Sequence, residues 1–172
     1  MTSDSLFEDV VDRALAEVRV RAIRIYTFAF YFDHESAAVS VCVDTRDNSD
    51  CVVRGINAYN LRHFCKAVDS SDLKVAALWQ ANTGRSLSFG DFAAVNLART
   101  DLPPEMLAVN FCAMVRAVMA RHEEIRVQSL DSSLTLLACS GPEEEVALVW
   151  SLPESPPNKP MQTDERRSGA RG

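Results

Sequence analysis

The sequence predicts a single α+β domain, in which a mostly antiparallel sheet carries about three packed helices. Three observations predict it. The 172 residues are enough for one ordinary domain and too few for two. Segments with the two-residue alternation of strands follow one another across short polar turns, which favours antiparallel pairing. Segments with helical periodicity interrupt them, in the order α, β, β, β, α, β, β, α, β, β, β, and no internal repeat is visible.

The N-terminal part of the chain predicts a helix followed by a central strand. Residues 5–19 carry a broad apolar stripe, and Ser5 with Glu8 has the spacing of a capping box. Residues 23–32 hold five of the thirteen aromatic residues and are apolar on both faces. A strand of that kind is covered on both sides, so we expect it in the middle of the sheet.

The next segment predicts a hairpin, a turn and a short strand. Residues 33–36 fit a hairpin turn, and residues 38–43 alternate as the second strand. Residues 45–50, with the sequence TRDNSD, have turn-forming chemistry, and residues 51–53 would form a third strand. The acidic side chains of this turn lack the two-residue spacing and the glycine of an EF-hand loop, so we expect a solvated turn rather than a calcium site.

A second helix is expected in the middle of the chain, after Gly55 and Asn57 and before residues 69–72. The apolar side chains of this helix, which we expect to face the core, are Leu61, Phe64, Cys65 and Val68. Residues 73–80 alternate and predict a strand, whereas residues 86–99 fit either a strand or a helical turn.

The last third of the chain predicts the clearest helix and three closing strands. Residues 103–105 would begin the helix, since Pro is well placed in a first turn. His122 falls on its buried stripe at the C-terminal end. The three strands are expected at residues 125–130, 134–139 and 146–152.

Composition and charge exclude several classes of protein. Apolar residues make up 47% of the chain and charged residues 24%, and the formal net charge is -6. These values exclude a collagen, a coiled-coil rod, a disulfide-rich mini-protein and a wholly disordered chain. Arg19, Arg21 and Arg24 form the only basic cluster of the domain, which is a poor footprint for nucleic acid on an acidic chain.

The C-terminal residues differ from the rest of the chain. Residues 153–172 hold four of the seven prolines and only two apolar residues, Met161 and Ala170. We therefore expect a disordered Pro/Arg-rich tail of net charge +1 and a globular domain over residues 1–152 of net charge -7. The tail fits a docking motif, or an extension of the kind found on small bacterial reading frames beside mobile gene cassettes.

The cysteines and the distribution of apolar residues predict a cytoplasmic protein. No secretory signal opens the chain, and no stretch approaches the length of about 18 apolar residues that a membrane helix needs. The five cysteines are odd in number and form no CxxC pair, so we expect buried reduced thiols and no metal or other cofactor. These cysteines are Cys42, Cys51, Cys65, Cys112 and Cys139.

Catalytic motifs are missing from the sequence, but two regions are candidates for a site. No P-loop, dinucleotide-binding, GxSxG or HExxH motif can be built from its residues. Trp79, Arg85, Asp91 and Asn96 surround a Gly-containing turn. This combination is typical of an ordinary strand–loop–helix corner, and it is also used by recognition surfaces. His122 fits a general base or proton sensor, or a helix-terminal residue that packs its ring.

Three segments carry a resemblance to a known family. They are YTFAFYFD (26–33), then LWQ (78–80) with FGDFAAVN (89–96), and finally TLLAC (135–139) with VALVWSL (146–152). In this order they resemble the bacterial family called domain of unknown function 4303, over about residues 5–153. The sequence DTRDNSD departs from the Asn-Thr pair that members carry after the second strand. The resemblance implies a bacterial α+β domain and no catalytic residue.

Together these observations predict a small bacterial protein that acts as a protein-interaction or accessory, immunity-like domain without catalysis. We expect another protein as its partner, and neither nucleic acid nor a membrane. The alternative is an enzyme of unknown type that uses a pocket near Trp79–Asn96 or His122. A third possibility is a homodimer that buries an apolar patch at the edge of the sheet.

Overall fold

The computed structural model describes residues 3–103, 109–142, 146 and 148–153. The predicted tail lies outside the described residues from residue 154 onward, and residues 104–105 of the predicted helix start lie outside them as well. The helices and strands are α1 (Ser3–Val20), β1 (Thr27–Asp33), β2 (Ala38–Asp44), α2 (Arg46–Asp69), α3 (Leu73–Ala76), the 3-10 turns η1 (Ala77–Trp79) and η2 (Phe89–Asp91), β3 (Ala94–Asp101), α4 (Phe111–Ala120), α5 (His122–Gln128), β4 (Leu136–Cys139) and β5 (Leu148–Ser151).

The strands form one mixed sheet of five, in the order β3-β2-β1-β4-β5. β1 pairs with β4 in parallel, and the other three pairings are antiparallel. The parallel pair requires a long crossover, which α4 and α5 supply. The predicted α+β class with a mostly antiparallel sheet is therefore confirmed, and β1 takes the central place expected of the strand that is apolar on both faces.

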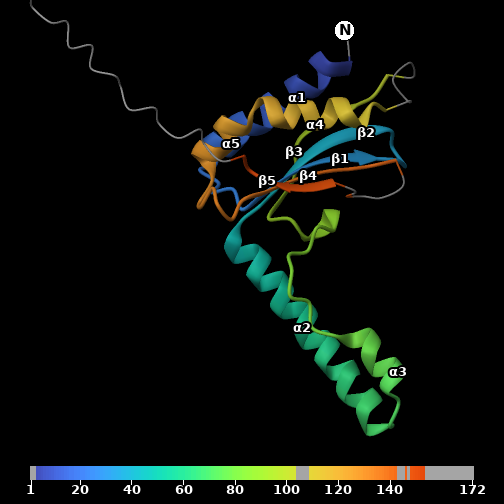
Figure 1. Cartoon of the computed structure of the whole chain (residues 1–172). Coiled ribbons are helices and arrows are strands. Elements are labelled where there is room, and N and C mark those ends of the chain that lie inside the picture. Colours follow the sequence, from blue (N-terminus) through green and yellow to red (C-terminus); the bar gives the residue numbers. More distant parts are fainter. Residues whose placement is uncertain (1–2, 104–108, 143–145, 147, 154–172) are drawn as a thin grey trace, which may run out of the picture.

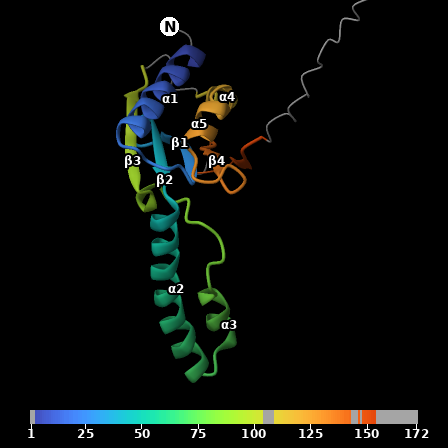
Figure 2. The same cartoon turned by 90° about the vertical axis from the view of Figure 1, so that its left-hand side faces the viewer.

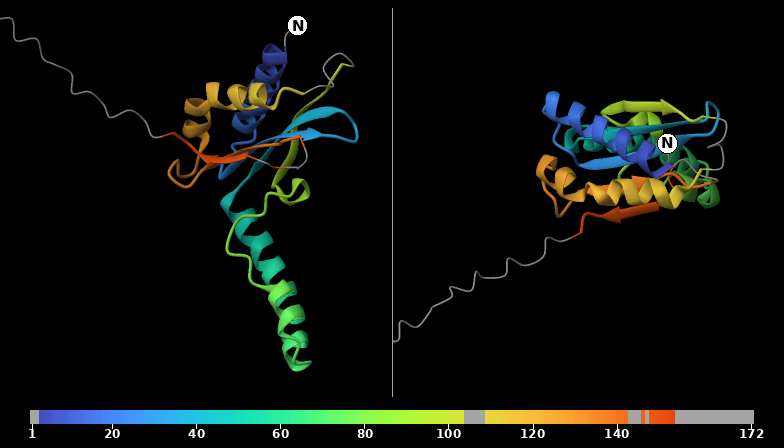
Figure 3. Two further views of the ribbon diagram at one scale, coloured as in Figure 1. Left: turned by 45° about the vertical axis from the view of Figure 1, so that its right-hand side comes forward. Right: turned by 90° about the horizontal axis from the view of Figure 1, so that it is seen from above.

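Helices α1, α4 and α5 cover one face of the sheet (Figures 1 and 3). Phe28 and Phe30 of β1 point into this layer, where they are fully buried. The ring of Phe30 meets the ring of Phe7 on α1 edge to face, with their centroids 5.8 Å apart. Two of the three predicted helices, the first and the last, therefore pack on the sheet, and α5 joins them although most of it lies where a strand was predicted.

The opposite face of the sheet has a smaller cover. Alternate side chains of β1 point to this side, so Ala29 and Tyr31 lie in a second cluster with Cys42. The ring of Tyr31 packs edge to face against Phe89 and Phe92, at centroid distances of 5.2 and 5.6 Å. The loop that leads into β3 therefore closes this face without a helix.

Helix α2 leaves the sheet and projects away from it, and α3 returns along its outer half (Figures 1 and 2). The predicted turn at 45–50 and strand at 51–53 are wrong, because both segments lie at the start of α2 or just before it. Thr45 is the N-cap of the helix, and its side chain accepts a hydrogen bond from the backbone N–H of Asn48 at 3.3 Å. The polar residues that suggested a turn thus begin a helix.

Two other predicted strands are helical. Residues 73–79 of the predicted strand form α3 and η1, and the Asp72 side chain caps the backbone N–H groups of Lys74 and Val75. Residues 125–130 fall mainly in α5, and only Ser129 makes a bridge, to Ile25. The segment 86–99, which fitted a strand or a helical turn, contains both η2 and most of β3.

The predicted burial of the second helix is wrong. Leu61, Phe64, Cys65 and Val68 are all exposed, and the buried residues of α2 are Ser49 and Ala67. The expectation of buried thiols holds for two of the five free cysteines. Cys42 and Cys139 are buried in the sheet, whereas Cys51, Cys65 and Cys112 are exposed on helices.

The predicted long helix of the last third is divided. Its described part begins at Phe111, where Asn110 is the N-cap and accepts a hydrogen bond from the N–H of Ala113 at 3.1 Å. The helix ends before Arg121, and His122 begins α5 rather than closing the buried stripe of α4.

Candidate functional site

The arm formed by residues 54–80 carries the largest group of exposed apolar side chains in the described structure. These residues comprise the outer part of α2, α3 and η1. The exposed fractions of the arm's large apolar side chains run from 38% at Phe64 to 75% at Leu73 and Leu78. The seven large apolar side chains concerned are Tyr59, Leu61, Phe64, Val68, Leu73, Val75 and Leu78. Exposed apolar side chains that gather on one part of a protein mark interaction sites.

An aromatic stack and amide hydrogen bonds hold the two sides of the arm together. Trp79 of η1 stacks on His63 of α2 with ring centroids 4.5 Å apart, and also meets Tyr59 at 5.8 Å. Near the base, the side chain of Asn57 donates to the carbonyl of Asn82 at 3.0 Å and accepts from its N–H at 2.6 Å. The arm is thus shaped by a few specific contacts rather than by a core.

The arm and the rest of the domain carry opposite net charge. Residues 54–80 contain four basic and two acidic side chains, a net charge of +2. The body, defined as residues 1–53 and 81–152, contains ten basic and nineteen acidic side chains, a net charge of -9. An apolar surface among basic groups therefore extends from an acidic body.

A buried carboxylate joins the arm to the body. Asp44, at the end of β2, is 2% exposed and accepts hydrogen bonds from the Asn48 side chain at 2.7 Å and from the Ala93 N–H at 3.2 Å. Burial raises the pKa of Asp44, although the hydrogen bonds from Asn48 and Ala93 oppose the shift. The Asn48 amide also donates to the carbonyl of Asp91 at 2.7 Å. The first turns of α2 are thereby fixed to the loop that leads into β3.

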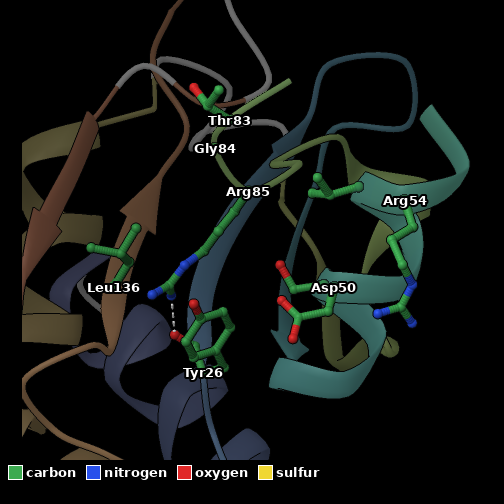
Figure 4. A pocket seen from close by; sticks show the side chains of 9 residues that line it. Tyr26, Asp50, Arg54, Thr83, Gly84, Arg85 and Leu136 are labelled. Atoms are coloured by element: carbon green, nitrogen blue, oxygen red, sulfur yellow. Dashed lines mark hydrogen bonds between the residues drawn. The ribbon is translucent and has the colours of Figure 1, made fainter. Parts of the chain in front are cut away.

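Arg85 lines a hollow of about 550 Å³ between the base of α2 and the sheet (Figure 4). Its guanidinium lies 3.3 Å from the ring centroid of Tyr26, donates to the Tyr26 carbonyl at 2.5 Å, and also donates to the carbonyl of Leu134. Burial lowers the pKa of Arg85. Asp50 enters the hollow from α2. Because Arg85 donates to two backbone carbonyls and to the Thr27 hydroxyl, this side chain fastens its loop to the sheet.

The predicted site residues do not converge on one hollow. Trp79 lines a groove of the arm together with Phe64, and Arg85 lines the hollow at the base. Asp91 accepts a hydrogen bond from the Ser86 hydroxyl, and neither Asp91 nor Asn96 lines these two cavities. Asn96 is exposed at a bulge of β3 with φ 54°, a conformation that Asn tolerates well. Their role as a binding site stays a prediction.

His122 lies away from the other candidates. Its Nδ1 is 2.7 Å from the carbonyl oxygen of Met119, and its Nε2 is 3.1 Å from a carboxylate oxygen of Glu123. α5 packs on the helix-covered face of the sheet, whereas the loop with Asp91 closes the opposite face. His122 and Asp91 therefore form no proton-transfer pair.

The side chains that sequence analysis missed are those of the arm surface. Leu61, Phe64 and Val68 were assigned to the core because their spacing is that of a buried stripe. Arg62 and Lys66 lie between these apolar residues in the sequence and leave only a narrow apolar face on the helix. This narrow face is the sequence feature that could indicate exposure. The sequence predicts a strand over residues 73–80, so it does not indicate that Leu73 and Leu78 belong to an exposed helical surface.

Comparison with known proteins found no matching family model, no matching curated protein and no matching solved structure. The resemblance to the domain of unknown function 4303 therefore stays a prediction. Among the described residues, no three His, Cys, Asp or Glu side chains gather as a metal site would require. None of the helices within the described ranges has both the length and the apolarity of a membrane-crossing segment.

Proposed function

We propose that this chain is a bacterial cytoplasmic protein-interaction domain of the accessory, immunity-like kind, and that it works without catalysis. The observation that supports the proposal is the exposed apolar arm of residues 54–80. Burying such side chains against a partner stabilises a complex by roughly 25 cal/mol per Å² of apolar area removed from water, before the costs of association. The aromatic stack of Trp79 and His63 keeps the surface ordered before the partner arrives.

The polar hollow at the base of α2 supports catalysis less well. An enzyme needs donors and acceptors that are free to meet a substrate. The guanidinium of Arg85 is committed to the carbonyls of Tyr26 and Leu134. Asp50 on the other side is exposed and has Arg46 beside it at 3.9 Å. These contacts favour a structural role for the hollow.

Photocrosslinking in the native cell tests the proposal. Leu78, which is 75% exposed on the arm, is replaced by p-benzoylphenylalanine, and the matched control carries the same group at the exposed Glu35 in the turn between β1 and β2. We expect a protein adduct of defined mass from the arm position and none from the control position. The absence of any protein adduct at Leu78 would contradict the proposal.

A further inference from the structure

We propose that the arm binds a second copy of this chain, such that each arm packs against the body of the other copy in a two-fold dimer. The inference rests on the proposed function, because it takes the arm to be a protein-docking surface and names its partner. Closed two-fold dimers are the commonest soluble assemblies. Two reciprocal arm-to-body contacts give such a closed dimer, whereas a single one-way contact would continue into a chain of copies.

Charge is the first argument for contact between arm and body. The arm carries +2 and the body -9, so contact between two arms brings like charges together and contact between arm and body brings opposite charges together. Within the described residues, none of the four basic side chains of the arm is in an ion pair, whereas eight of the ten basic side chains of the body are. The unpaired cations of the arm are Arg54, Arg62, Lys66 and Lys74.

The body offers a matching apolar surface at the end where α1 and α5 finish (Figure 1). Val20 is 80% exposed, Val127 is 70% exposed and Leu130 is 52% exposed. Asp131 follows Leu130 directly, and hydrogen bonds from Ser133 lower the pKa of its carboxyl group, so the group is ionised at neutral pH.

Arg19, Arg21 and Arg126 also lie at this end, but each is paired with a glutamate of the body, and Arg24 donates to the carbonyl of Ser129. Within the described residues Asp131 is in no ion pair, so this end combines apolar side chains with an unpaired carboxylate, as the arm combines them with unpaired cations.

The length of the arm allows the exchange. The part of α2 that belongs to the arm, residues 54–69, spans about 24 Å at about 1.5 Å per residue, which exceeds the separation of roughly 10 Å between packed layers. Two reciprocal contacts also bury the arm surface twice per dimer, which doubles the apolar area that one such contact removes from water. The arm of one copy can thus reach the body of the other while the two sheets stay apart.

Sedimentation velocity of the full chain over a range of micromolar concentrations gives the first test. We expect a species of twice the 19.0 kDa chain mass. Leu61→Ser on the arm and Val127→Ser on the body should each raise the dimer dissociation constant at least about tenfold. Both positions are exposed, so the fold should survive, which circular dichroism checks. The matched control, Val95→Ser at an exposed position of β3, should leave the dissociation constant unchanged.

Mixing the two variants distinguishes a dimer with reciprocal arm-to-body contacts from a dimer in which the two arms contact each other. A heterodimer of Leu61→Ser and Val127→Ser retains one intact arm-to-body contact, so the mixture should dimerise more tightly than either variant alone. A dimer held by two arms predicts no such gain, since every mixed dimer then contains one altered arm. The absence of the gain would overturn the proposed geometry.

Charge reversal and salt give an independent test of the same geometry. The double variant Arg62→Glu/Lys66→Glu changes the arm from +2 to -2, so it should weaken the dimer at least about tenfold. Added salt should weaken the wild-type dimer, because it screens attraction between arm and body. Strengthening by salt would indicate contact between like-charged arms and would overturn the inference.

The outcomes distinguish this inference from the proposed function. A chain that remains monomeric at every concentration overturns the second copy as the partner. If the Leu78 crosslink then captures a different protein, the docking function stands and only the identity of the partner is wrong. If neither a dimer nor a crosslink forms, both proposals fail.

Discussion

The body and the arm show that apolar side chains at the same helical spacing are buried in one helix and exposed in another. In α1, apolar side chains at helical spacing, such as Val11 and Leu15, are fully buried in the core. In α2, Leu61 and Phe64 have the same kind of spacing, yet they are 61% and 38% exposed. The body therefore owes its stability to its own core, whereas the arm presents its apolar side chains outward. Substitutions that are equivalent in chemistry should differ sharply in effect between the two regions.

Replacing Phe30 should give the largest loss of stability. Phe30 is fully buried in the sheet and packs against the ring of Phe7, so Phe30→Ala should lower the free energy of unfolding by about 3–5 kcal/mol. The matched change Phe64→Ala on the arm should cost less than about 1 kcal/mol in the monomer. Urea denaturation at low protein concentration measures both. Equal losses would show that the arm has a core of its own.

Two arginines that lie over tyrosine rings give a second comparison. Arg85→Met removes the donor to the carbonyls of Tyr26 and Leu134 and should cost about 1–3 kcal/mol in unfolding free energy. Arg62, on the arm, lies 5.8 Å from the ring centroid of Tyr59 and is exposed. Arg62→Met should therefore change stability by less than about 0.5 kcal/mol.

The same urea series checks this pair of arginine variants. An Arg85→Met protein as stable as the wild type would mean that the hollow does not hold the loop to the sheet. Arg85 would then be free to meet a ligand, which would reopen the catalytic interpretation of the hollow.

The fold could be predicted where one segment decides its own structure. The aromatic run that contains β1 alternates over enough residues to require burial on both faces, and it forms the central strand. The errors fall on short segments such as residues 51–53 and 125–130, each of which holds only two β-branched residues, too few to outweigh the helix that surrounds them. At residues 51–53 the cap, Thr45, lies outside the segment that it decides.

The candidate site could be predicted only in fragments. Trp79 and Arg85 stood out as residue types, but the partners of Arg85 lie 59 and 49 residues away in the chain, at Tyr26 and Leu134. Periodicity shows that a helix has an apolar face and does not show what covers it. The exposure of Leu61 follows from the direction in which α2 leaves the sheet, and that direction depends on the tertiary contacts of Asp44 and Asn48.

The junction between body and arm should give a pH-dependent effect. The folded-state pKa of Asp44 is raised above its ordinary value of 3.8, so the folded protein holds this proton more tightly than the unfolded chain does. The free energy of unfolding should therefore fall as pH rises from 3.8 through the folded pKa and remain lower above it. Asp44→Asn keeps the oxygen that accepts from Asn48 and Ala93 and does not titrate.

Denaturation of both proteins across pH measures this effect. The stability of Asp44→Asn relative to the wild type should rise between about pH 3 and about pH 7. A relative stability that falls over this range would mean that the hydrogen bonds to the carboxylate outweigh its burial. Asp33→Asn is the contrasting control. Hydrogen bonds from Ser36 lower the pKa of Asp33 to about 2. The stability that this carboxylate contributes to the wild type is therefore fully present above pH 3.8 and is lost as the pH falls through about 2.

The smallest effect is expected for Leu61→Ala on the stability of the monomer. Leu61 is 61% exposed, and Ala has the higher helix propensity, so the free energy of unfolding should change by less than about 0.5 kcal/mol at concentrations below the dimer dissociation constant. At higher concentrations the same variant should lose more, because the proposed dimer adds the free energy of association to the wild type and adds less to the variant. Denaturation at two protein concentrations separates the two terms. A loss of more than about 2 kcal/mol that is independent of concentration would show that Leu61 packs within its own chain, and the contrast between body and arm would disappear.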